Sequence, residues 1–104
     1  MESQEYPLQH FQLMAKLAGD LVAMRAQILE HGYHCNAFGS WWTTLQRRGI
    51  VFRIVFDGKE RELRLERATR SDKAESWEEL DSWSASDPDG AGAFPEVVAR
   101  LRAV

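Results

Sequence analysis

The residues best suited to chemistry gather in one short segment, which holds Glu30, His31, His34 and Cys35. Carboxylate, imidazole and thiolate groups at this spacing are zinc ligands, but a zinc site needs three or four of them, and one or more usually comes from elsewhere in the chain. The remaining histidine, His10, is expected about 30 Å from His31 if both lie on one helix, at about 1.5 Å per residue. We therefore expect no metal site and no cofactor.

The same segment also lacks the parts of a nucleophilic mechanism. Cys35 would need a base, an orienting third group and an oxyanion site, and only the base, His31 or His34, can be named. The neighbouring carboxylates Glu78 and Glu79 lie in a charged segment, which is more typical of a solvated surface than of a general acid and base. The sequence thus predicts a protein that is not an enzyme.

Composition bounds the remaining classes of function. The chain has 104 residues, of which 44% are hydrophobic, so residues 1–104 are expected to form a single domain. Its net charge of -3 argues against general affinity for nucleic acid or for anionic membranes. Its apolar runs are shorter than the roughly 18 residues of a membrane span, and its first ten residues do not resemble a secretory signal. One cysteine suits a reducing compartment, so we expect a cytoplasmic protein.

Two helices are predicted at the ends of the chain. Apolar residues recur in steps of three and four from Leu8 onward and predict one amphipathic helix from Pro7 to His31. Pro7 suits its first turn, and Gly32 suits the position just past its end. A last helix is expected to begin at Phe94, where proline and glutamate follow in the first turn.

Between the helices, the sequence predicts three antiparallel strands, near residues 39–47, 50–57 and 60–67. The first turn is Arg48-Gly49. Its register pairs Trp41 with Phe56, Thr43 with Ile54, and Leu45 with Phe52.

The second turn, Asp57-Gly58, matches a two-residue type I′ hairpin, and its register pairs Arg53 with Glu62 as a cross-strand ion pair. The two turns agree on one buried face. Its predicted members are Trp41, Leu45, Ile50, Phe52, Ile54, Leu63 and Leu65.

An acidic connection follows the strands. Between Asp72 and Asp89 the only basic residue is Lys73, and tryptophans recur at Trp77 and Trp83. A short helical turn or an extra strand around residues 75–83 would let these aromatic side chains cover a sheet edge. The predicted fold is therefore α+β in the order helix, three strands, acidic connection, helix.

Trp42 points away from the predicted core face, because it alternates with Trp41. Either the acidic connection folds over it, or it forms part of an aromatic patch rimmed by charge, as at a protein interface. We expect a partner-binding surface built from the acidic connection and this tryptophan. Its predicted residues are Glu75, Trp77, Glu78, Glu79, Asp81, Trp83, Asp87, Asp89 and Trp42.

The layout of Gly39-Ser40-Trp41, residues 53–65 (RIVFDGKERELRL), and Trp77 with Leu80 resembles small bacterial immunity proteins of polymorphic toxin systems, in particular the TriTu-like group. The resemblance implies a non-enzymatic protein that binds one cognate toxin and protects the producing cell. It supplies no catalytic residues. A toxin that cleaves nucleic acid has a basic cleft, to which an acidic surface with aromatic anchors is complementary.

Two alternatives belong to other classes of function. One is a small acidic secretion chaperone that holds an unfolded effector segment on an open strand edge and an apolar groove. The other is a nucleic-acid-binding module that uses the arginines of the strands, although the start of the last helix offers acids where double-stranded RNA-binding domains place lysines.

Overall fold

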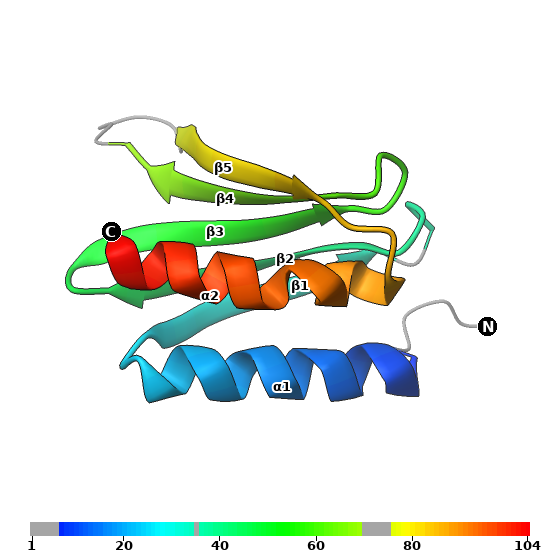
Figure 1. Ribbon diagram of the computed structural model, residues 1–104, viewed down its shortest axis with the longest axis horizontal. Coiled ribbons are helices and arrows are strands. Elements are labelled where there is room, and N and C mark those ends of the chain that lie inside the picture. The colour runs from blue at the N-terminus through cyan, green and yellow to red at the C-terminus, as the bar shows by residue number, and fades with distance from the viewer. Residues whose placement is uncertain (1–6, 35, 70–75) are drawn as a thin grey trace.

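The computed structural model describes residues 7–34, 36–69 and 76–104 of the chain. Two helices lie on the same face of a five-stranded antiparallel sheet, whose strands follow one another in chain order (Figure 1). The elements are α1 (Leu8–Ala23), β1 (Gln27–His34), β2 (Ser40–Arg47), β3 (Ile50–Asp57), β4 (Glu62–Ala68), β5 (Trp77–Ser84), the short 3-10 segment η1 (Pro88–Ala93) and α2 (Phe94–Ala103). The α+β class is confirmed, but the prediction of three strands is wrong.

The first helix ends eight residues before the predicted His31. Arg25 adopts a left-handed conformation with φ of 66°, and the Ala26 N–H donates to the Leu21 carbonyl over 3.0 Å. Together with the bond from the Arg25 N–H to the Val22 carbonyl at 2.9 Å, this is a Schellman ending. Arginine replaces the usual glycine at the left-handed position, so the sequence carried no visible stop signal.

The residues assigned to the end of that helix form the edge strand β1 instead. Its pairing with β2 shifts between Ile28 and Glu30, so Leu29 is an extra, bulged residue. The bulge breaks the alternation of apolar and polar residues that would otherwise have identified a strand. Gly32, which we expected to end the helix, lies inside β1 opposite Trp42.

The turn between β2 and β3 has the predicted register, with Trp41 opposite Phe56 and Leu45 opposite Phe52. The next hairpin does not. Arg53 lies opposite Glu66 rather than Glu62, a shift of four residues.

The cause of that shift is Asp57, whose carboxylate accepts the N–H groups of Lys59 and Glu60 over 3.0 and 3.1 Å and so closes a longer loop. Gly58 is needed for close packing, because a side chain there would run into the backbone of Phe38. An even shift keeps every side chain on its predicted face.

The acidic connection contains a fifth strand, which is one of the two structures considered for it. β5 pairs with β4 along its whole length, with a bulge where Leu65 opposes Asp81 and Glu66 opposes Glu79. Leu80 and Trp83 pack against the core, so one aromatic side chain of this segment does cover the sheet edge on the helix side.

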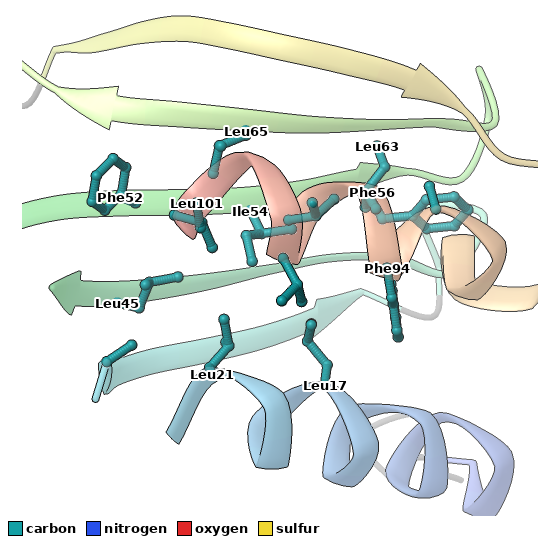
Figure 2. Packing of buried hydrophobic residues seen from close by; sticks show 14 of the residues in the cluster. Leu17, Leu21, Leu45, Phe52, Ile54, Phe56, Leu63, Leu65, Phe94 and Leu101 are labelled. Carbon is teal, nitrogen blue, oxygen red and sulfur yellow. The ribbon is translucent and has the colours of Figure 1, made fainter. Parts of the chain in front are cut away.

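The core fills the space between the two helices and the inner face of the sheet (Figure 2). Leu17 and Leu21 of α1 and Leu101 of α2 are almost fully buried there. Six predicted core residues are confirmed as buried, namely Trp41, Leu45, Phe52, Ile54, Leu63 and Leu65. Ile50 is not one of them, since it begins β3 beside the turn and is 36% exposed.

The last helix begins at Phe94, as predicted, with Pro95 and Glu96 in its first turn. Within the described residues, neither helix combines the length and apolar character that crossing a membrane requires.

Candidate functional site

One face of the sheet carries no helix in the described part of the chain. Along β2 and β3 every second residue is buried under the helices, and the residues between them are only half-buried. We call this second side the uncovered face. From the strand registers, its central residues are Trp42, Thr44, Val51, Arg53, Val55, Arg64, Glu66, Trp77 and Glu79.

Trp42 anchors one end of the uncovered face. Its indole ring lies flat over Gly32 of β1, where any side chain would overlap the ring. His34 stacks on the same indole with ring centroids 5.0 Å apart. Trp42 is therefore held in place by its own sheet while the residue stays half-exposed, a combination that would suit an anchor for a partner. Whether residues 70–75 cover it lies outside the described residues.

Trp77 anchors the other end through an arginine. The Arg53 guanidinium carbon lies 4.2 Å from the centroid of the Trp77 ring, within cation–π range. Arg53 also contacts Glu66 at 2.6 Å, and Arg64 approaches the second oxygen of Glu66 at 3.7 Å. This network links side chains from β3, β4 and β5.

The uncovered face is acidic. Arg53 and Arg64, its described cations, both contact carboxylates. Glu79 lies opposite Glu66 and is exposed, and no ion pair among the described residues includes it. By strand register, the carboxylates on this side are Glu30, Asp57, Glu62, Glu66 and Glu79.

The structure divides the predicted partner-binding residues between the two faces. Trp42, Trp77 and Glu79 share the uncovered face. Trp83 packs on the helix side, where Asp81 also approaches Arg100 of α2 at 3.6 Å. The other predicted members lie elsewhere, with Glu78 paired to Arg67, Asp87 preceding η1, Asp89 inside a part-buried cluster and Glu75 outside the described residues.

That part-buried cluster is a second candidate site, which the sequence did not predict. Nδ1 of His10 lies 3.0 Å from an Asp89 carboxylate oxygen, and its Nε2 lies 3.0 Å from Nε2 of His31. Nδ1 of His31 lies 2.8 Å from the Thr43 hydroxyl. We call Asp89, His10, His31 and Thr43 the histidine chain. His10, at its centre, is 2% exposed.

Four elements position the histidine chain. His10 comes from α1, His31 from β1, Thr43 from β2 and Asp89 from η1. Asp89 adopts a left-handed conformation with φ of 57°, which aspartate tolerates better than most residues, and its carbonyl accepts the Trp41 indole N–H over 3.1 Å.

The expected 30 Å between His10 and His31 was wrong because the chain reverses after α1. Recognising Arg25 as the end of the helix would have brought the two histidines together. His34, which we had considered beside His31, points to the opposite face, because residues three apart on a strand alternate.

Each end of the histidine chain opens on a pocket. A pocket of about 220 Å³ is lined by His10, Asp89 and Arg61, among others. An apolar pocket of about 170 Å³, between α1 and the sheet, is lined by His31 and Thr43. Burial and the neighbouring charge of His10 lower the pKa of His31 below its ordinary value of 6.5.

Within the described residues, the histidine chain does not bring together the ligands of a metal site. No cluster of three His, Cys, Asp or Glu side chains with metal-binding geometry exists among residues 7–34, 36–69 and 76–104. The Thr43 hydroxyl lies within reach of a base, His31, but Thr43 is buried in the middle of a strand.

Comparison with known proteins gives no match: no family model, no curated protein and no solved structure is significantly similar to this chain.

Proposed function

We propose that this protein is a non-enzymatic immunity protein, which binds and neutralises the folded domain of a basic toxin, such as a nuclease. The observation that carries the proposal is the uncovered face, where Trp42 and Trp77 are held by their own sheet beside unneutralised carboxylates. Aromatic side chains fixed in advance lose little conformational freedom on binding, so they are efficient anchors.

Charge favours the same partner. Glu30 and Glu79, at the two edges of the uncovered face, are exposed carboxylates on a protein of net charge -3. Complementary charge raises the rate of association with a basic surface and discriminates against acidic ones. The tight inhibition that an immunity protein needs would combine this steering with the desolvation of the two tryptophans.

The arginines of the strands do not favour nucleic acid as the partner. Arg53 and Arg64 contact Glu66, and Arg67 contacts Glu78 at 2.8 Å. Arg47 donates to the carbonyls of Met24 and Leu101 on the helix side. A phosphate backbone would therefore meet paired cations beside carboxylates, rather than a basic stripe.

Growth rescue tests the proposal. The toxin candidate is the carboxyl-terminal domain encoded by the gene immediately upstream. If the proposal is right, expressing that domain alone stops growth, and co-expressing this chain restores it. Val55, half-buried in the centre of the uncovered face, is then changed to arginine. The Val55→Arg variant is expected to lose rescue and to bind at least about 30-fold more weakly.

The matched control is Glu96→Arg, an exposed position on α2 at the other side of the molecule. It changes the charge by +2, against +1 for Val55→Arg, and because it lies away from the uncovered face it should leave rescue intact. Equal rescue by both variants would contradict the role of the uncovered face. A domain that is not toxic, or toxicity that this chain does not relieve, would contradict the immunity function itself.

One observation favours a secretion chaperone as the second candidate. Leu8, Phe11 and Val22 of α1 are 71, 62 and 61% exposed, and they follow one stripe of the helix. A chaperone could hold an extended apolar segment there. The Val22→Glu variant distinguishes the two functions. It would abolish partner binding by a chaperone, whereas it would change the partner affinity of an immunity protein by less than about twofold.

A further inference from the structure

The histidine chain fixes the place of each proton in its neutral state. The Asp89 carboxylate only accepts, so Nδ1 of His10 must carry a hydrogen. Nε2 of a neutral His10 must then accept, and it receives the N–H of His31 Nε2 over 3.0 Å. Nδ1 of His31 is left to accept from the Thr43 hydroxyl over 2.8 Å. Each ring nitrogen has a partner in this arrangement.

One added proton also fits without loss of a hydrogen bond. His10 then donates from both nitrogens, to Asp89 and to Nε2 of His31. The proton of His31 moves to Nδ1, from which it donates to the Thr43 oxygen. The new positive charge lies beside the Asp89 carboxylate, where it forms a buried ion pair.

A second added proton does not fit. Both Nε2 atoms would carry a hydrogen across the same 3.0 Å, and neither could accept. Two imidazolium rings with centroids 5.2 Å apart would also repel each other, the more so because His10 is buried and His31 half-buried. The conflict is relieved when the two Nε2 atoms separate, and movement of α1 away from β1 separates them.

The pKa of His31 is lowered, as the conflict between two protonated rings requires. Burial lowers it most and the charge of His10 lowers it further, whereas a hydrogen bond to the backbone of Trp42 and the charge of Asp89 oppose the change. The unfolded chain, with the ordinary value of 6.5, therefore binds this proton more readily than the folded chain. The stability that His31 contributes is complete above about pH 6.5 and decreases as the pH falls from there toward the lowered pKa.

We propose that the histidine chain is an acid-operated latch, which holds the first turns of α1 and the segment η1 against β1 and β2 and releases both when the second proton binds. Protons can reach the latch through the pockets at its two ends. The other titratable or charged side chains described around it are Tyr33, whose ring centroid lies 4.2 Å from that of His10, and Arg61, which lines the same pocket as Asp89. The latch operates whatever binds the uncovered face.

Amide hydrogen exchange measured by NMR, corrected for intrinsic exchange, tests the latch. Between about pH 7.5 and pH 5, the opening equilibrium of the first turns of α1 should increase by up to tenfold per pH unit below about 6.5. Amides at the centre of β3 should keep their protection. The His31→Gln variant retains donors and an acceptor but does not titrate, so its dependence should be flat. The matched control, His34→Gln, removes a histidine outside the latch and should keep the wild-type dependence.

Equal α1 protection at both pH values, or wild-type dependence in His31→Gln, would overturn the latch. If His31→Gln does not fold, the tautomers of the two histidines in the wild-type protein, observed at their ring nitrogens by NMR, test the latch instead. At about pH 7.5 the latch requires the Nδ1–H tautomer of His10 and the Nε2–H tautomer of His31. The opposite tautomers contradict it. A pH dependence that disappears with EDTA would also overturn it, since a metal ion rather than a proton would then join the two Nε2 atoms.

Discussion

The two faces of the sheet treat polar groups in opposite ways. On the helix side, the histidine chain is largely buried, and each of its hydrogen bonds joins a different pair of elements. On the uncovered face, Arg53, Glu66 and Trp77 form a network near solvent, and the neighbouring Glu79 has no ion pair with a described residue. Hydrogen-bonded polar groups inside a protein stabilise its fold, whereas half-exposed and rigid ones suit recognition. Substitutions should therefore separate the two faces, with changes in stability on one and changes in binding on the other.

The largest expected effect is on the stability of the helix side. His10→Ala leaves Asp89 and His31 without their shared partner and creates a cavity, so it should lower the free energy of unfolding by about 3 kcal/mol. Urea denaturation measures this change. His34→Ala, on the uncovered face, should cost less than about 1 kcal/mol. Similar losses in the two variants would erase the difference between the faces.

The next largest effect is on binding. Trp77→Ala should weaken partner affinity by about 30-fold, because a fixed aromatic anchor is removed, while the free energy of unfolding changes by less than about 1 kcal/mol. Isothermal titration calorimetry gives the affinity, and urea denaturation gives the stability. A large loss of stability with unchanged affinity would show that Trp77 is a structural residue instead.

A smaller difference is expected between the coupling free energies of two ion pairs. Arg53 and Glu66 lie 2.6 Å apart with side chains 28 and 12% exposed, so a double-mutant cycle with Arg53→Met and Glu66→Gln should give a coupling of about 1 kcal/mol. The control cycle uses Arg67 and Glu78, which are 38 and 51% exposed at 2.8 Å, and should give less than about 0.5 kcal/mol because water screens the pair. Equal couplings would mean that the network on the uncovered face is not preorganised.

The smallest expected effect is a gain in stability from a substitution in α1. Gly19 lies inside the helix with nothing within 4 Å of the place a side chain would occupy. Gly19→Ala should therefore raise the free energy of unfolding by about 0.5 kcal/mol through helix propensity alone. Thermal denaturation measures the gain. Partner affinity should not change, and a change would move the binding site from the uncovered face to α1.

The sequence predicted on which side of the sheet most strand residues lie, but little of how distant segments of the chain come together. Alternation along residues 40–57 identified the buried side chains, because side-chain direction depends only on whether the strand register is shifted by an odd or even number. The register of the second hairpin failed, because Asp57 bonds to backbone N–H groups rather than occupying a type I′ turn. Local patterns thus fixed orientation more reliably than pairing.

The histidine chain could not be predicted, because it depends on a helix ending at a non-glycine residue. Arg25 in the left-handed region has no sequence signature, and with the helix extended to His31, His10 and His31 stay far apart. The fifth strand was also only one of two alternatives, since the bulge at Leu80 interrupts its alternation. Bulges and unusual helix ends are stabilised by tertiary contacts, which local propensity does not contain.

The most direct test of the account compares two neighbouring carboxylates of β5. Glu79 lies on the uncovered face, and Asp81 lies on the helix side near Arg100. If the uncovered face binds a basic partner, Glu79→Lys should weaken affinity by about tenfold, whereas Asp81→Lys should change it by less than about twofold. Equal losses, or a larger loss for Asp81→Lys, would contradict the assignment of recognition to the uncovered face.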